Sequence, residues 1–294
     1  GAPADVPVLP IQGSVSMLVT PAGNVTVQIG EQGVLVVDTS VAEDSDGIVA
    51  AIRRLTDKPI RYIVNTHAHP DHVGGNASIA RAGATVGGGT IGAAFTPSGA
   101  SILAHENVLA RMSAPTGSQA PTPTGAWPTN TYFGERKELY FNGEAVEILH
   151  QPAAHTDGDS LVFFRRSDVL SAGDLFLTTT YPVIDLKWGG TIQGVIDGLN
   201  RILVLTVPKD KQEGGTYVVP GHGRLCDEAD VLEYRDMVTI VRDRIRDMVS
   251  RGMTLQQVKA ARPTLDYDGR YGSKTGAWTT DMFVEAVYRT LGGK

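Results

Sequence analysis

Cysteine, long apolar runs and clustered basic residues are scarce or missing in this chain of 294 residues. The single cysteine, Cys226, excludes an internal disulfide framework and a zinc cluster built from cysteines. Because no run of about 18 or more apolar residues occurs, we expect no membrane span. The formal net charge is −6 and basic residues alternate with acids, as in Arg242-Asp243-Arg244, so no nucleic-acid partner is expected. With 41% hydrophobic and 20% charged residues, the composition indicates an ordinary globular protein.

The amino terminus bears on where the protein works. The chain starts at Gly1 rather than Met, which indicates that a targeting peptide or an engineered extension was removed. Residues 1–10 are rich in Ala and Pro and have the composition of a tether. We therefore expect a processed periplasmic or secreted enzyme, with a trimmed cytoplasmic enzyme as the alternative.

Hydrophobic periodicity predicts two strand-rich halves that also contain helices. The predicted strands are residues 25–29, 34–37, 60–64, 145–149, 161–164, 169–170 and 216–219, with a hairpin turn at residues 30–33. The predicted helices are residues 47–55, 74–81, 102–112, 191–203, 229–251 and 280–291. A further short helix is predicted to start at Thr254, because Thr254 and Gln257 have the spacing of a capping box. Two such halves with helices outside predict an α/β, four-layered αββα sandwich, formed by residues 1–294 as a single domain with a helical C-terminal segment at 229–291.

Residues 113–130 interrupt this pattern with a stretch dense in Pro, Thr, Ser and Gly. A loop of this length inside a compact domain is typical of a functional lid, and an inert surface loop is the alternative. Trp127 and Tyr132 would give a lid apolar surface with which to close.

The segment His67-Ala68-His69-Pro70-Asp71-His72 is the strongest chemical signal in the sequence. Zinc binds imidazole nitrogen and carboxylate oxygen where thiolate is absent. In an extended segment, positions 67, 69 and 71 point one way and position 72 the other, which suits two adjacent metal ions better than one. A solvated His-rich loop is the alternative, but four ligand-type residues within six positions favour a metal site.

Three further polar residues follow or precede predicted strands beside glycine, where functional side chains are usually presented. They are His155 in a polar loop, Asp174 after Gly173, and His222 after Gly221. Each would more often be structural when taken singly. Together with the first segment they predict one site.

In these residues the chain resembles the metallo-β-lactamase superfamily. The matching residues are 66–72, His155, Gly173-Asp174 and Gly221-His222, in the family's order, and Asp38 matches an acidic residue that ends an early strand. The resemblance covers residues 24–223 and implies the αββα fold and two Zn²⁺ ions per chain. It also implies that His67, His69 and His155 bind one ion, that Asp71, His72 and His222 bind the other, and that Asp174 bridges them.

The chemistry expected of such a site is hydrolysis of a small-molecule substrate. Two ions about 3.5–4 Å apart lower the pKa of a shared water toward 7, so that hydroxide attacks a carbonyl carbon. Asp71 is the candidate catalytic residue because it can orient the nucleophile and help to move its proton. Asp38, Thr66 and Asp159 are candidates to hydrogen-bond the ligands, and local backbone capping is the alternative for Asp38.

The substrate is left open between cyclic amides of the β-lactam kind and esters, lactones or thioesters. The largest lactamase subclass has Cys at the position of Asp174 and Lys at that of Leu177, so the aspartate here is more similar to the glyoxalase II and lactonase branches. A basic cluster for glutathione and a lactonase-like Tyr at position 177 are both missing, however. Two other functions remain as alternatives: an iron-dependent sulfur dioxygenase with one metal ion, and a non-catalytic metal-binding protein.

Several other residues are interpreted as secondary. His105, predicted on a helix, and His150, after a strand, are expected to be structural, and Cys226 to be a buried filler. Tyr181, Lys187 and Trp188 lie between Asp174 and the next predicted helix, where substrate contacts would be expected.

Overall fold

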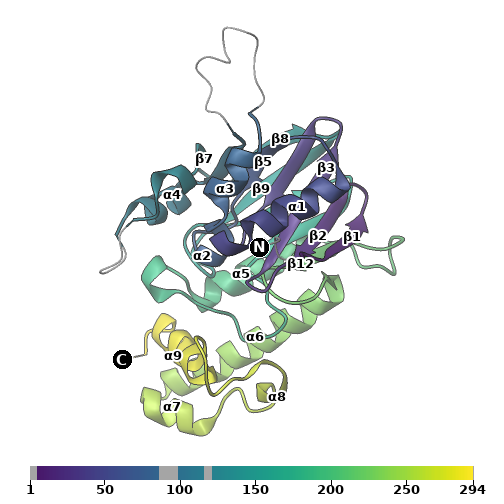
Figure 1. Ribbon diagram of the computed structural model, residues 1–294. Coiled ribbons are helices and arrows are strands. Elements are labelled where there is room, and N and C mark those ends of the chain that lie inside the picture. Colours follow the sequence, from purple (N-terminus) through teal and green to yellow (C-terminus); the bar gives the residue numbers. More distant parts are fainter. Residues whose placement is uncertain (1–4, 86–98, 116–120, 294) are drawn as a thin grey trace. The chain divides into compact units, whose positions relative to one another are not determined.

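A computed structural model describes residues 5–85, 99–115 and 121–293 of the chain. It divides into two compact units. Figure 1 labels the helices and strands along the chain. The first unit comprises residues 1–150 and 160–171, and the second comprises residues 151–159 and 172–294. The prediction of a single domain over residues 1–294 stays a prediction.

The first unit is built on a seven-stranded sheet whose strands lie side by side in chain order. The strands are β1 (Val8–Gln12), β2 (Val15–Val19), β3 (Asn24–Gly30), β4 (Gly33–Val37), β5 (Ile60–Val64), β6 (Ser101–His105) and β7 (Asn130–Tyr132). Strands β1 to β4 pair antiparallel, and β4 to β7 pair parallel. The predicted turn between β3 and β4 is confirmed, because Gly30 pairs with Gly33.

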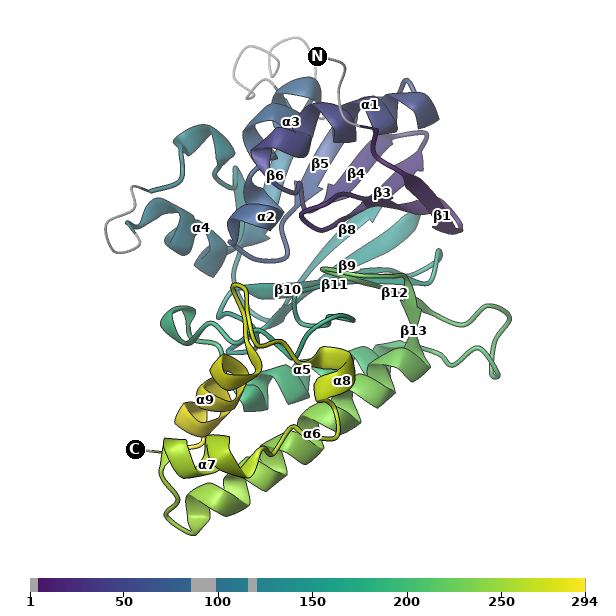
Figure 2. The same ribbon diagram turned by 60° about the horizontal axis from the view of Figure 1, so that its bottom comes forward.

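Helices cover one face of this sheet because parallel strands need crossover connections. Helix α1 (Ser45–Leu55) joins β4 to β5, and α2 (Pro70–Val73) and α3 (Asn76–Ala82) follow β5. Figure 2 shows α1 and α3 over the sheet. Ile48 and Ile52 of α1, Ile79 of α3 and Ile63 of β5 are fully buried in one apolar core. Burying each such side chain contributes about 1.5–3 kcal/mol relative to leaving it exposed.

The second sheet begins in the same unit with β8 (Arg136–Phe141), β9 (Glu144–Gln151), β10 (Asp159–Phe164) and β11 (Val169–Gly173). Strands β8 and β9 form one antiparallel hairpin, and β10 and β11 form another. Polar side chains join the facing sheets: Thr26 Oγ1 donates to Ser171 Oγ at 3.3 Å, and Gln28 Nε2 donates to Glu144 Oε1 at 2.7 Å. The two sheets of this unit therefore pack face to face.

Glu144 is the most heavily hydrogen-bonded of these polar residues, and the residue is 4% exposed. It also accepts from the backbone N–H groups of Arg166 and Ser167, both at 2.9 Å, and from the Ser167 hydroxyl at 2.7 Å. Glu144→Ala leaves these buried donors without an acceptor, so we expect the free energy of unfolding to fall by about 3 kcal/mol or more. Urea denaturation measures this. Glu138→Ala, on the half-exposed surface of β8, is the control and should change little; an equally small loss for Glu144→Ala would contradict the prediction.

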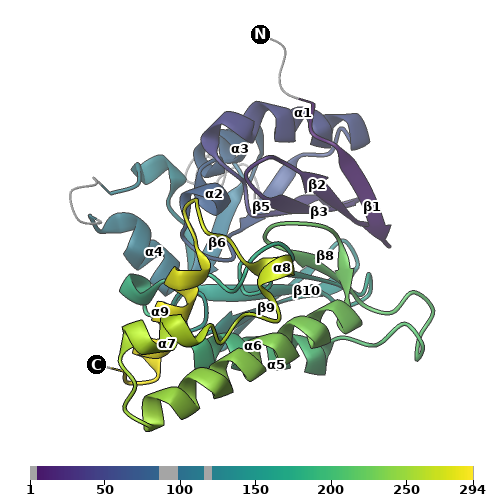
Figure 3. The ribbon, with the colours of Figure 1, turned by 90° about the horizontal axis from the view of Figure 1, so that it is seen from below.

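The second unit is largely helical and contains a short hairpin of β12 (Tyr217–Pro220) and β13 (Cys226–Asp227). Its helices are α5 (Ile192–Leu205), α6 (Glu228–Ser250), α7 (Leu255–Ala261), α8 (Asp268–Tyr271) and α9 (Thr280–Thr290). Figure 3 shows α6 running the length of this unit. The predicted capping box is confirmed, because Gln257 N–H donates to Thr254 Oγ1 and Thr254 N–H donates to Gln257 Oε1. Gly252 ends α6 with a positive φ of 74°, as expected for a helix C-cap.

One predicted helix, residues 102–112, is wrong in its first turn. Residues 102–105 belong to strand β6 and only residues 106–113 form helix α4 (Glu106–Ser113), so His105 ends a strand. The predicted helix at residues 74–81 is confirmed as α3, and the short helix α2, which was not predicted, precedes it. Tyr132 is buried on β7 and its hydroxyl lies 2.8 Å from Ser160 Oγ, so it is part of the packed unit rather than of a lid. The rest of the predicted lid includes residues 116–120, which lie outside the described residues.

Among the helices that the structure describes, none is long and apolar enough to cross a membrane.

Candidate metal centre

The carboxyl ends of the parallel strands β4 and β5 present Asp38 and Thr66 side by side. The register that pairs Val37 with Val64 sets this position, and Asp38 N–H donates to Val64 O at 2.9 Å. Functional side chains of α/β sheets usually lie at this edge. Asp38 holds φ at +61°, a left-handed conformation that Asp adopts more readily than most residues.

Four predicted ligands follow β5 closely, and the structure brings their side chains together. The ring centroids of His67 and His72 are 4.1 Å apart, and those of His67 and His69 are 4.9 Å apart. Asp71 Oδ2 lies 3.8 Å from His72 Nε2. The expected extended geometry is wrong beyond His69, because Pro70 begins helix α2 and fixes Asp71 and His72 on a helical turn. His67 and His72 are buried, whereas His69 and Asp71 are partly exposed.

Asp38 orients two of these histidines. Its Oδ2 lies 2.8 Å from His72 Nδ1 and accepts the Thr66 hydroxyl proton at 2.7 Å, while Oδ1 accepts from Thr66 N–H at 2.8 Å. Thr66 Oγ1 in turn lies 3.1 Å from His67 Nδ1. Because the hydroxyl proton is given to Asp38, the oxygen is left to accept from Nδ1–H of His67. These contacts leave Nε2 of both histidines as the candidate ligand atom, and the predicted hydrogen bonds of Asp38 and Thr66 to these side chains are present.

The remaining three predicted ligands also lie close together, within the second unit. His155 precedes β10, Asp174 follows β11 and His222 follows β12. Asp174 Oδ2 lies 3.8 Å from His155 Nε2, and Asp174 Oδ1 lies 3.4 Å from His222 Nε2. Two ligand atoms held about 2.0–2.1 Å from one tetrahedral zinc ion are about 3.4 Å apart, so both spacings suit ligands that share a cation.

The orientation of His155 comes from a group that the sequence did not reveal. Its Nδ1 lies 2.7 Å from the backbone carbonyl oxygen of Val183, which leaves Nε2 as the candidate ligand atom. No residue type signals such a carbonyl in a sequence. Asp159 accepts from Thr156 N–H at 2.8 Å and from the Thr156 hydroxyl at 2.7 Å, so it fixes the loop that carries His155. Burial raises the pKa of the Asp159 carboxyl, against the opposing effects of His155 and of the Thr156 hydrogen bonds.

Gly221 is required next to Asp174. Its N–H donates to Gly173 O at 2.8 Å, and a Cβ added to it would overlap Asp174 Oδ1 and lie 2.8 Å from the carbonyl carbon of Gly173. Gly221→Ala should therefore displace the Asp174 carboxylate and lower kcat/KM by about ten- to a hundredfold, since misplacement by about 1 Å has effects of this size. Steady-state kinetics measure this, with Gly269→Ala, whose Cβ would meet nothing within 4 Å, as the control. Equal activity of the two variants would contradict the prediction.

The residues to which the sequence assigned structural roles or substrate contacts lie in different surroundings. Tyr181 is buried in the core of the second unit, stacks on Phe283 at 4.7 Å and donates to Asp268 Oδ1 at 2.9 Å, so a substrate contact is not its role. Lys187 is exposed and Trp188 is partly exposed, on a turn. The rings of His105 and His150 stack at 3.6 Å, and His105 Nδ1 accepts from Asn107 N–H at the start of α4, which agrees with structural roles.

Cys226 is buried on β13, as predicted, and burial raises the pKa of its thiol to about 12. Because the thiolate is the reactive species, a chromogenic disulfide reagent should leave the folded protein unmodified at about pH 8. One thiol per chain should react after unfolding in guanidinium. Rapid reaction of the folded protein, followed by absorbance, would show that the thiol is accessible.

The seven side chains together comprise five imidazoles and two carboxylates, each offering one ligand atom: His67, His69, Asp71, His72, His155, Asp174 and His222. Nitrogen and oxygen donors of this kind fit zinc and related divalent ions. The same set is typical of one protein family, and the sequence model of the metallo-β-lactamase superfamily matches residues 19–222. The chain belongs to the metallo-β-lactamase superfamily, and the predicted fold class is confirmed.

Several characterised proteins are similar in sequence. The α subunit of 2,4-dinitroanisole O-demethylase from Nocardioides sp. (strain JS1661) is 31% identical over 169 residues, which cover 54% of this chain and 43% of that protein. A linear primary-alkylsulfatase from Pseudomonas sp. (strain ATCC 19151) is 24% identical over 252 residues, 76% of this chain and 46% of the enzyme. A type 2 metallo-β-lactamase from Bacillus cereus is 22% identical over 216 residues, 70% of this chain and 69% of the lactamase. The chain thus spans less than half the length of the first two relatives.

Solved structures show the same fold. The stereoselective inverting sec-alkylsulfatase from Pseudomonas sp. superposes with a TM-score of 0.69 at 15% identity, over 98% of this chain and 50% of the enzyme. The metallo-β-lactamase from Pontibacter korlensis superposes with a TM-score of 0.60 at 15% identity, over 80% of this chain and 99% of the lactamase. At these identities the likeness establishes the fold alone.

Proposed function

We propose that the protein is a zinc-dependent hydrolase in which the seven side chains bind two zinc ions. His67, His69 and His155 would bind one ion, Asp71, His72 and His222 the other, and Asp174 both. The observation that carries the proposal is the position of Asp174, whose two oxygens face different imidazoles at 3.4 and 3.8 Å. A carboxylate that bridges two ions presents one oxygen to each.

The chemistry divides between the ions and the chain's own residues. When bound, such ions would supply positive charge that polarises a substrate oxygen and lowers the pKa of a bound water. Asp38 and Thr66 hold the imidazoles of His72 and His67 in one orientation, and the Val183 carbonyl does the same for His155. Asp71 is partly exposed, so its carboxylate can orient the attacking water and accept its proton.

The substrate class that we propose is a carbonyl compound: a β-lactam-like cyclic amide, an ester, a lactone or a thioester. Alkyl sulfate esters form a second candidate class, because a linear primary-alkylsulfatase aligns with 76% of this chain. Turnover of nitrocefin, a lactone, a thioester and dodecyl sulfate by the zinc-loaded protein separates the two classes. Lack of turnover of all four would exclude both.

Metal content tests the hydrolase proposal directly. Two zinc ions per chain, measured by plasma mass spectrometry after gentle purification, would support it. One iron ion per chain would instead support a sulfur dioxygenase, which would leave part of the ligand set without a metal. A non-catalytic metal-binding protein would hold its metal and show no activity that depends on Asp71.

Two expectations from the sequence stay proposals. We propose a periplasmic or secreted location, which cell fractionation of the native host would test. We also propose that residues 1–294 act as one domain, which a single cooperative unfolding transition would support.

A further inference from the structure

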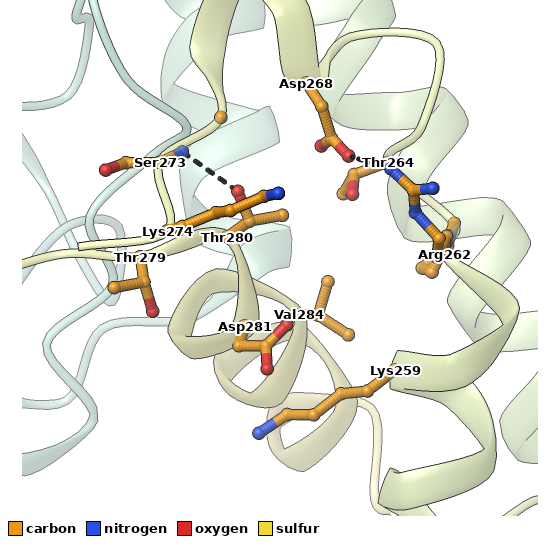
Figure 4. A pocket seen from close by; sticks show the side chains of 12 residues that line it. Lys259, Arg262, Thr264, Asp268, Ser273, Lys274, Thr279, Thr280, Asp281 and Val284 are labelled. Atoms are coloured by element: carbon orange, nitrogen blue, oxygen red, sulfur yellow. Dashed lines mark hydrogen bonds and ion pairs between the residues drawn. The ribbon is translucent and has the colours of Figure 1, made fainter.

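A cavity of about 570 Å³ lies in the second unit among helices α7, α8 and α9 (Figure 4). Its volume falls within the range of about 300–1,000 Å³ that is usual for small-molecule sites. It is lined by Lys259, Arg262, Pro263, Thr264, Asp268, Gly272, Ser273, Lys274, Thr279, Thr280, Asp281 and Val284. None of these residues belongs to the candidate metal centre, so the cavity requires an explanation of its own.

Three cationic side chains line the cavity. The Lys259 ammonium is held 3.0 Å from Glu285, and the Arg262 guanidinium lies 3.6 Å from Asp268. The side chain of Arg262 is 60% exposed, so this loose pair contributes little and leaves the guanidinium able to turn to a ligand. In Figure 4, Lys274 lies along Thr280, and its ammonium is directed toward the side of the cavity that carries Thr264 and Arg262.

The backbone of Arg262 is unusual for its position. Arg262 is the C-cap of α7 and holds φ at 51° and ψ at 61°, the left-handed conformation that glycine or asparagine normally takes at a helix end. A side chain in this conformation costs free energy, and such outliers cluster at binding sites. A glycine would end the helix more easily than this arginine does.

Hydroxyl groups complete this side of the cavity. Thr280 Oγ1 accepts from Ser273 N–H at 3.0 Å, which leaves its hydroxyl proton as a donor. Thr279, at the start of α9, is also on the lining. A guanidinium, an ammonium and a hydroxyl around one space are the donors that recognise tetrahedral oxyanions, because charge-assisted hydrogen bonds to them are strong.

We propose that this cavity binds a small organic molecule through a phosphate or sulfate group, with Arg262 and Lys274 as its principal contacts. Asp281, also on the lining and exposed, opposes the anion and limits its affinity. The site is separate from the proposed hydrolase function, so loss of one proposal leaves the other standing.

Calorimetric titration of the purified 294-residue protein with inorganic phosphate, inorganic sulfate and succinate tests the proposal. Arg262→Gly and Lys274→Met should each weaken phosphate binding by at least about tenfold, the effect of losing one charge-assisted contact. Arg262→Gly should not lower the melting temperature, because glycine suits the left-handed backbone. Asp281→Asn should tighten binding about threefold, since it removes a like charge.

Lys211→Gln, which removes an exposed cation in a loop outside the cavity, is the matched control and should leave phosphate binding unchanged. Phosphate binding that survives both Arg262→Gly and Lys274→Met would place the anion elsewhere and overturn the proposal. Absence of binding up to about 10 mM phosphate and sulfate would also overturn it, since a binding free energy of less than about 3 kcal/mol is too small for two charge-assisted contacts. Succinate binding as tightly as phosphate would overturn the assignment to tetrahedral oxyanions.

Discussion

Replacing Asp174 with alanine is expected to lower kcat/KM for the hydrolysed substrate by about a thousandfold or more. The carboxylate faces the imidazoles of both His155 and His222, so its loss removes a ligand from each proposed ion. Loss of metal-derived charge stabilisation amounts to several kcal/mol in the transition state, which corresponds to this factor. Zinc content should fall below two ions per chain in the same preparation.

The control for this variant is Asp210→Ala, which removes an exposed carboxylate from the same unit. It should retain both the zinc and the activity. If Asp174→Ala also keeps two zinc ions and normal turnover, the assignment of Asp174 as a shared ligand is wrong.

Asp38→Ala is expected to have the second-largest effect, and it should act on both metal affinity and stability. The variant leaves Thr66 N–H, the Thr66 hydroxyl and His72 Nδ1 without the carboxylate that all three contact. Loss of a partner that orients a metal ligand typically costs about 10- to 100-fold in affinity. Buried donors without an acceptor should lower the free energy of unfolding by about 2–3 kcal/mol.

The matched variant Asp38→Asn separates these two effects. Asparagine tolerates the left-handed backbone and keeps one acceptor oxygen, so stability should largely return while zinc affinity stays reduced. Zinc competition with a chromogenic chelator and urea denaturation measure the two quantities, with exposed Asp57→Ala as the control. Unchanged zinc affinity in both Asp38 variants would show that this carboxylate does not orient a ligand.

Much of the candidate site was predictable because its residues lie close to one another in sequence or at strand ends. Residues 67–72 form one local segment, and Asp38 directly follows an apolar strand whose parallel partner leads to Thr66. The turn at Gly30 and Gly33 and the capping box at Thr254 were predictable for the same reason, since both depend on a few adjacent residues.

The features that could not be predicted depend on contacts between distant residues. The run Ile102-Leu103-Ala104 is apolar at every position, and such a run does not distinguish a buried strand from a helix until its neighbours are known. Tyr181 lies in the core because α9 packs against it through Phe283, more than a hundred residues further along the chain. The Val183 carbonyl that orients His155 carries no side-chain signal at all.

The pairing of Val37 with Val64 also bears on how a preparation of this protein should be judged. A slip of β5 by one residue along β4 would move Thr66 about 3.3 Å from Asp38 and turn every side chain of the strand to the opposite face. Such a molecule would retain most of its helices and strands, and its circular dichroism spectrum would hardly change. Its His72 would nevertheless have lost the contact with Asp38. The amount of tightly held zinc per chain would then report the fraction of molecules with the correct register. It is therefore a better criterion of batch quality than secondary-structure content.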